Sequence, residues 1–334
     1  MNQKVVIIGG GIIGCLTAIE LVKKSVEVLV VEKSSIGNEA SKAAGGVLFP
    51  LMPWNYESFV YGLCKNSSKY YRELEKILFD NTNIDIELIN SGIQILPPFN
   101  NDEIVNWCKN NFIEAEKSSF NNHKTLLIKD IFQVNPPKLM RALKIYLKKI
   151  GVDILENSEV INFEQNYNKV IACDVKDFGK VYGDKFIIAS GAWSSQINEK
   201  LSKFVYPVRG QVIQYEKSDI KLKHIIFRDG TYILQRKDNS IVVGSTLENV
   251  GFSKENVEES INFLNSRAIS MIHELKGLKI EKHWFGFRPG TEKNKPIVKV
   301  DDFFDNLFLN TGHHRYGITM APHTATSLVD YVTC

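Results

Sequence analysis

The chain of 334 residues carries 41 Lys and Arg against 38 Asp and Glu, which leaves a net charge of only +3. So small an excess does not indicate a nucleic-acid-binding protein. The five cysteines are an odd number and include no C-x-x-C pair, which argues against a disulfide framework, a zinc ribbon and a dithiol redox centre. Any redox chemistry must therefore come from a bound cofactor, and the length suffices for one large domain or two interleaved ones.

The first strongly patterned stretch opens the chain. Residues 5–8 form a short, wholly apolar run, typical of a parallel strand buried on both faces. A G-x-G-x-x-G pattern follows at Gly9, Gly11 and Gly14, and then a helix over 15–24, a strand over 26–31 and the acidic Glu32. The glycines allow a tight turn and close approach of the backbone to a pyrophosphate, and the carboxylate accepts from ribose hydroxyls. This order of elements predicts a dinucleotide site rather than an ordinary glycine-rich turn.

The same stretch has one competing interpretation as a secretory signal, because Lys4 precedes the apolar run. Three consecutive glycines interrupt that run, and no small-residue cleavage site precedes the charged Glu20, Lys23 and Lys24. No apolar stretch reaches the roughly 18 residues that a membrane span needs. We therefore expect a cytoplasmic protein without a membrane span.

Residues 40–47, Ala-Ser-Lys-Ala-Ala-Gly-Gly-Val, form the next informative stretch. Small residues in series let the backbone press against a flat, bulky group, although close helix–sheet packing gives the same pattern. Together with the opening fingerprint, this stretch resembles the D-amino-acid oxidase family of FAD-dependent oxidoreductases, and within it the glycine oxidases. Gly45 departs from the alanine more usual in glycine oxidases, so the space beside the flavin is expected to differ.

The resemblance implies an α/β fold in which a Rossmann-type FAD-binding domain is interleaved with an antiparallel-sheet substrate domain. We expect the FAD-binding domain to comprise residues 1–82, 134–206 and 284–334, and the substrate-binding domain to comprise 83–133 and 207–283. Alternating apolar residues predict a meander of antiparallel strands over 212–215, 232–235 and 241–243. Helical spacing predicts helices over 57–78, 138–149 and 256–276.

The implied cofactor is FAD, bound non-covalently. Related sarcosine oxidases tether their flavin through a cysteine soon after the arginine motif, and residues 292–300 contain no cysteine. The fingerprint and the resemblance together assign these cofactor-binding positions: Gly9, Gly11, Ile12, Ile13, Gly14, Glu32, Lys33, Ser41, Gly45, Gly46, Val47, Val160, Gly191, Gly312, His313, His314, Arg315, Tyr316, Gly317, Ile318 and Thr319.

The resemblance also assigns the substrate site. The family's carboxylate-binding arginine falls on Arg288, within Gly-Phe-Arg-Pro-Gly, where a guanidinium fork can hold a carboxylate through two parallel bonds. Tyr232 matches the family's tyrosine that contacts the same carboxylate, and Arg315 matches a second arginine near the flavin and the substrate. Leu247 stands where glycine oxidases have a methionine beside the substrate, so the pocket wall is expected to be apolar but reshaped.

Each of these residues also has an ordinary explanation: a surface ion pair for Arg288, core packing for Tyr232 and a solvated pair for the two adjacent histidines. Those two histidines lack a third spaced ligand, so no metal site is predicted.

The implied reaction is oxidation of a small amino acid (glycine, sarcosine or a small D-amino acid) to an imine, which hydrolyses to an oxo acid and ammonia. Oxygen would reoxidise the flavin and give hydrogen peroxide, and in the family the imine can supply thiazole synthesis for thiamine. The small amino acid and oxygen are the expected partners, without nucleic acid, and a homo-oligomer is left open. Three alternatives remain: a D-amino-acid or proline dehydrogenase that passes electrons to a carrier, a tRNA-modifying flavoprotein and a non-enzymatic flavin-binding scaffold.

Overall fold

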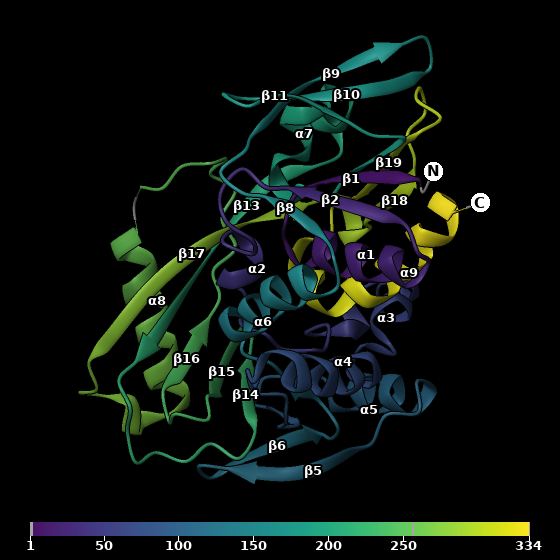
Figure 1. The fold of residues 1–334 in the computed structure, drawn as a ribbon. Coiled ribbons are helices and arrows are strands. Elements are labelled where there is room, and N and C mark those ends of the chain that lie inside the picture. Colours follow the sequence, from purple (N-terminus) through teal and green to yellow (C-terminus); the bar gives the residue numbers. More distant parts are fainter. Residues whose placement is uncertain (1–2, 256, 334) are drawn as a thin grey trace.

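The computed structural model describes residues 3–255 and 257–333. A six-stranded sheet in the order β18-β19-β12-β1-β2-β8 lies at the centre of the first part of the fold (Figure 1). The pairs β8–β2, β2–β1, β1–β12 and β12–β19 are parallel, and only β18 runs antiparallel to its neighbour. The strands are β1 (Lys4–Ile8), β2 (Glu27–Val31), β8 (Asp153–Leu155), β12 (Lys185–Ile188), β18 (Ile297–Val300) and β19 (Leu307–Thr311).

The two faces of this sheet are covered differently, as the alternation of side chains along a strand requires. Val5 and Ile7 of β1 pack against helices, whereas Val6 and Ile8 pack against a three-stranded sheet on the other face. The covering helices are α1 (Ile12–Lys23), α4 (Ser67–Thr82), α6 (Pro136–Lys149) and α9 (Gly317–Thr333). The three-stranded sheet consists of β9 (Val160–Asn166), β10 (Lys169–Val175) and β11 (Gly179–Tyr182).

A second large sheet has eight strands in the order β17-β13-β16-β15-β14-β4-β6-β5. All neighbouring pairs are antiparallel except β4–β14, so the sheet is mixed rather than purely antiparallel as expected. Its strands are β4 (Ile93–Ile95), β5 (Ala115–Phe120), β6 (His123–Ile128), β13 (Tyr206–Tyr215), β14 (Ile225–Arg228), β15 (Thr231–Gln235), β16 (Ile241–Gly244) and β17 (Ile280–Gly290). Helix α8 (Val257–Met271) packs on one face, and helix α5 (Asn101–Asn110) on the other.

One expected domain boundary falls inside a strand, and two expected helices have different limits in the structure. Strand β17 belongs as a whole to the mixed sheet, so the domain boundary expected at residue 284 falls inside a strand. The helix expected over 57–78 is divided into α3 (Ser58–Cys64) and α4. The helix expected over 256–276 ends at Met271 and is followed by a short 3-10 turn, η4 (His273–Leu275), while residue 256 lies outside the described residues.

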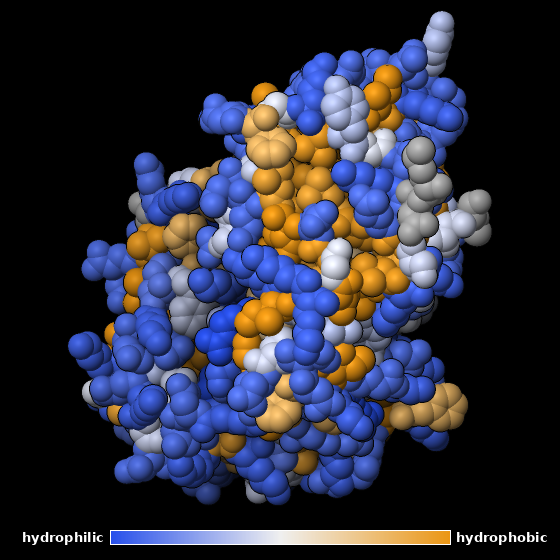
Figure 2. Space-filling model, viewed as in Figure 1, coloured by the Kyte–Doolittle hydropathy of each residue, from blue (hydrophilic) through white to orange (hydrophobic). Residues whose placement is uncertain are grey.

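Other short elements complete the chain: β3 (Ile89–Asn90), β7 (Phe132–Gln133), α2 (Ala40–Ala43), α7 (Ser194–Ile197), η1 (Pro53–Asn55), η2 (Gly191–Trp193), η3 (Glu199–Lys203), η5 (Glu292–Asn294) and η6 (His314–Tyr316). Hydrophilic side chains cover most of the face seen in Figure 2, with an apolar area near its middle, over the region where β2 and β8 run in Figure 1. Within the described ranges, no helix combines the length and the apolar character that crossing a membrane requires.

Candidate active site

A cavity of about 330 Å³ lies between the two large sheets. Residues that follow the carboxyl ends of β1, β2, β12 and β19 line one part of it, and residues of β13, β15 and β17 line another. The carboxyl edge of a parallel α/β sheet is the usual place for a bound ligand. The mixed sheet closes the cavity from the opposite side.

The cavity brings together most of the predicted site, although these residues come from segments far apart in the chain. The predicted residues that line it are Gly9, Gly11, Ile12, Ile13, Glu32, Lys33, Ser41, Gly45, Gly46, Val47, Val160, Gly191, Tyr232, Arg288, His313, His314, Arg315, Tyr316, Gly317, Ile318 and Thr319.

Three predicted residues do not line this cavity. Gly14 packs where helix α1 meets the turn after β1, and a Cβ there would lie closer than 3.0 Å to the Gly9 carbonyl oxygen. Gly312 has a φ of +82° and shapes the turn after β19, where its carbonyl accepts from Thr291 Oγ1 at 2.9 Å. Leu247, expected in the pocket wall, is 55% exposed and does not line this cavity, so its place beside the substrate remains a prediction. Its neighbours in the chain, Thr246 and Glu248, both form hydrogen bonds with Gln211 in a polar cluster.

The nucleotide end of the cavity is built by the start of α1 and the end of β2. Gly11 is the N-cap of α1, and Ser41 Oγ accepts from the Ile12 amide at 2.9 Å. No acidic residue occupies the first turn of α1, so the positive end of the helix dipole remains available for an anion. The buried Glu32 carboxylate accepts from Gly10 N at 2.7 Å and from Ser34 N at 2.9 Å, which fixes its position after β2.

Trp193 also lines the cavity, although it was not among the predicted site residues. The Lys33 ammonium lies 3.2 Å from the centroid of its ring, and Phe252 stacks on it with ring centroids 5.0 Å apart. Lys33 also pairs with Glu39 at 3.6 Å. Trp193 follows a buried strand and a glycine turn, and this position at the carboxyl edge of the sheet was the signal that could have identified it.

Tyr232 stands at the other end of the cavity, with its hydroxyl between two glycines. A Cβ on either Gly45 or Gly244 would lie closer than 3.0 Å to that hydroxyl. The absence of a side chain at these two positions therefore makes room for the Tyr232 ring and hydroxyl. Arg236 holds the Gly45 segment in place, because its Nη2 donates to Gly45 O at 2.8 Å and its Nη1 to Val134 O at 2.7 Å. Burial raises the pKa of the Tyr232 hydroxyl, so the group is a neutral hydrogen-bond donor.

Arg288 extends from β17 across Gly210 of the neighbouring strand, where a Cβ would lie closer than 3.0 Å to the guanidinium. Its Nη1 donates to Thr246 O at 3.0 Å and its Nη2 to Ser245 Oγ at 2.7 Å. Burial, assisted by the charge of Arg315, lowers the pKa of Arg288 to about 10, which still leaves it charged at neutral pH. Within residues 3–255 and 257–333, neither Arg288 nor Arg315 pairs with a carboxylate. The two guanidinium groups therefore form a positive region suited to an anionic ligand.

The two adjacent histidines are neutral. Burial lowers the pKa of His313 to about 3, and burial together with the charges of Arg288 and Arg315 lowers the pKa of His314 to about 3. His313 Nε2 bonds with Thr324 Oγ1 at 2.9 Å, and His314 Nδ1 contacts Asn294 Oδ1. His313 Nδ1 and His314 Nε2 are buried without a hydrogen-bond partner in the described part of the chain, as expected of polar atoms whose partner is a bound ligand. Across the same residues, no group of three or more His, Cys, Asp or Glu side chains is placed to hold a metal ion.

The chain belongs to the family of FAD-dependent oxidoreductases called DAO, whose sequence profile matches residues 4–331. Glycine oxidase of Pseudomonas aeruginosa is 31% identical, and the alignment covers 100% of this chain and 95% of that protein. The bifunctional protein ThiO/ThiG of Trichormus variabilis is 30% identical over 99% of this chain, which matches 53% of that longer protein. The crystal structure of glycine oxidase from Bacillus cereus ATCC 14579 has a TM-score of 0.89 at 28% identity, and covers 99% of this chain and 95% of that one.

These comparisons confirm the predicted family, fold class, enzyme class and FAD cofactor. The residues of the cavity fit FAD. The α1 start would face the pyrophosphate, Glu32 lies where a ribose is expected, and the small residues of 40–47 leave room for a flat ring system.

Proposed function

We propose that this enzyme oxidises a small amino acid, with glycine and sarcosine as its best substrates. For glycine, oxygen and water would yield glyoxylate, ammonia and hydrogen peroxide. The observation that carries the proposal is the Arg288 guanidinium, which lies in the same cavity as the nucleotide fingerprint and has no carboxylate partner among the described residues. A substrate carboxylate would supply the missing negative charge.

The side chains at this end would bind and orient the substrate. Arg288 would hold the carboxylate through its planar fork, and the neutral Tyr232 hydroxyl would donate to the same group. Arg315 adds a second positive charge, while Phe49 and Leu51 contribute apolar wall that limits water. Bound FAD would supply the two-electron chemistry, so the protein's task is to present the substrate Cα in a fixed orientation.

Among the residues that the structure describes, no side chain at this end is suited to act as a general base. His313 and His314 have pKa values near 3 and are buried, so their low basicity makes them poor proton acceptors. The substrate amine would therefore have to be neutral when it is oxidised. The resulting imine would hydrolyse in water to the oxo acid and ammonia.

The relatives support the substrate class and its pathway. The glycine oxidases match this chain along nearly their whole length, which favours glycine over larger amino acids. The match to ThiO/ThiG proteins favours a role for the imine in thiazole synthesis for thiamine. We also propose that FAD is bound non-covalently, that residues of the six-stranded sheet hold it, and that the mixed sheet contributes most of the substrate site.

The test is reduction of the flavin by candidate substrates without oxygen. The purified FAD-bound enzyme would be mixed anaerobically with glycine, sarcosine, D-alanine, D-proline or D-phenylalanine while the visible flavin band is followed. Glycine and sarcosine should bleach it fastest, since each methylene that does not fit costs about 1–3 kcal/mol in discrimination. Admission of air should then restore the band and give one hydrogen peroxide for each substrate oxidised. Faster bleaching by D-phenylalanine than by glycine would contradict the proposal.

A further inference from the structure

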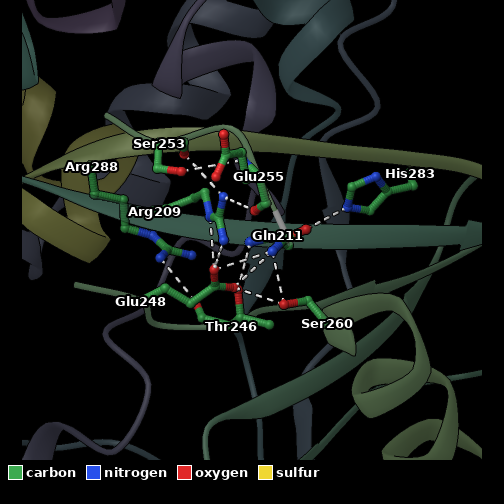
Figure 3. A network of polar contacts seen from close by, with 9 residues as sticks. All are labelled: Arg209, Gln211, Thr246, Glu248, Ser253, Glu255, Ser260, His283 and Arg288. Carbon is green, nitrogen blue, oxygen red and sulfur yellow. Dashed lines mark hydrogen bonds and ion pairs between the residues drawn. The ribbon is translucent and has the colours of Figure 1, made fainter. Parts of the chain in front are cut away.

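A buried polar cluster lies beside the Arg288 guanidinium, on the strand next to β17 (Figure 3). Arg209 of β13 is only 2% exposed, and its backbone exchanges two hydrogen bonds of 2.9 Å with that of Glu248. The two side chains are paired as well, since Arg209 Nε lies 2.7 Å and Nη2 2.5 Å from Glu248 Oε2. Arg209 and Glu248 therefore clamp the segment after β16 onto β13 through both backbone and side chains.

The Glu248 carboxylate has further donors around it. Gln211 Nε2 lies 2.9 Å and Ser260 Oγ 3.0 Å from Oε1, and the Thr246 hydroxyl also donates to this oxygen. With Arg209 on the other oxygen, the carboxylate is fully engaged. It therefore makes no ion pair with Arg288.

Thr246 connects this cluster to Arg288. Its hydroxyl accepts from Gln211 N at 2.9 Å, while its carbonyl accepts from Arg288 Nη1 at 3.0 Å. The preceding residue, Ser245, accepts from Arg288 Nη2 at 2.7 Å. Both acceptors that orient the guanidinium thus belong to the segment that the Arg209–Glu248 pair clamps.

We propose that Arg209 and Glu248 are positioning residues for the substrate anchor Arg288, and that they act through Thr246. The inference rests on the proposed function, in which Arg288 binds the substrate carboxylate. An arginine side chain has many rotamers, and a site that orders the side chain beforehand loses less entropy when the ligand binds. The clamp keeps Thr246 O and Ser245 Oγ in place, so the guanidinium lies across Gly210 with its charge free for a carboxylate.

The experiment measures binding of acetate to the FAD-bound enzyme from the change in its flavin spectrum. Because only folded, FAD-bound protein contributes to the signal, the dissociation constant is independent of how much protein unfolds. Glu248→Gln and Thr246→Val should each weaken acetate binding by about three- to tenfold, the range expected when one hydrogen-bonded contact is lost. The kcat for saturating glycine should change less than KM. Glu281→Gln is the matched control, because Glu281 is an exposed carboxylate on the same strand as Arg288 and should bind acetate like the wild type.

A double-mutant cycle separates positioning from a general structural role. In an Arg288→Lys background, which keeps the charge but lacks the fork, Glu248→Gln should weaken acetate binding by less than twofold. An undiminished effect in that background would overturn the inference, and so would single variants that bind acetate as tightly as the wild type. If Glu248→Gln does not retain FAD, the nearly isosteric Thr246→Val supplies the same comparison. A wild-type enzyme that binds no acetate would instead refute the proposed function, and this inference with it.

Discussion

Substitution of Gly45 by alanine should damage the substrate site while leaving the nucleotide end intact. The added Cβ would lie 2.6 Å from Tyr232 Cε2 and closer still to the hydroxyl, whereas ordinary contacts begin at 3.4 Å. The ring edge must therefore retreat by about 0.8 Å, and the hydroxyl by more. Gly244 lies on the other side of that hydroxyl and Arg236 holds the Gly45 carbonyl, so neither neighbour can move freely.

Two magnitudes follow from this crowding. Overpacking of a buried site costs about 1–3 kcal/mol of stability, which should lower the Tm by a few degrees. A displaced Tyr232 hydroxyl loses one hydrogen bond to the substrate, about 0.5–1.5 kcal/mol, so kcat/KM for glycine should fall roughly two- to tenfold. Steady-state kinetics and thermal unfolding of the FAD-bound enzyme measure both quantities.

Gly62→Ala is the matched control, because a Cβ at this position in α3 would meet nothing within 4 Å. It should leave kinetics unchanged and raise the stability, since alanine is favoured over glycine in a helix by up to about 1 kcal/mol. If Gly45→Ala had the Tm and kcat/KM of the wild type, Tyr232 would not occupy the slot between Gly45 and Gly244 in solution, and the reasoning would be refuted.

Three further predictions concern the anchor, the cofactor and pH. Arg288→Ala should lower kcat/KM for glycine by about ten- to a hundredfold without loss of the flavin spectrum, because a charge-assisted hydrogen bond contributes roughly 1.5–3 kcal/mol. Near-normal activity, or loss of the flavin, would show that Arg288 is not the substrate anchor. Acid or heat denaturation should release all the yellow chromophore into the supernatant, and colour on the precipitated chain would indicate a covalent bond. His313 and His314 have folded-state pKa values near 3, below the ordinary 6.5, so below about pH 6.5 each histidine takes up a proton when the protein unfolds. Each should therefore lower the free energy of unfolding by up to about 1.4 kcal/mol per pH unit as the pH falls below about 6.5. Urea unfolding at pH 7 and pH 5 should reveal this loss, and His313→Asn should reduce it.

The sequence by itself determined the nucleotide-binding half of the protein. The strand, the glycine turn, the helix and Glu32 follow one another within 32 residues, and local spacing alone places them at one edge of a parallel sheet. The expected strands and helix recur as β1, α1 and β2, and the cavity is lined by Gly9, Gly11 and Glu32. Arg288 and Tyr232, which were named by resemblance rather than by local pattern, also line the cavity, and their roles toward the substrate remain a proposal.

Tertiary structure alone decided how the substrate side chains are held. Tyr232 faces Gly244 because β15 and β16 pair in that register, and it meets Gly45 only because the chain returns after nearly 190 residues. The register of β13 and β17 likewise places Gly210 under the Arg288 guanidinium. Leu247, which the resemblance had placed in the pocket wall, is exposed in the folded chain. A short motif reflects the local backbone geometry that its residues require. These contacts depend instead on the pairing of strands from distant segments, and no short stretch of sequence encodes that pairing.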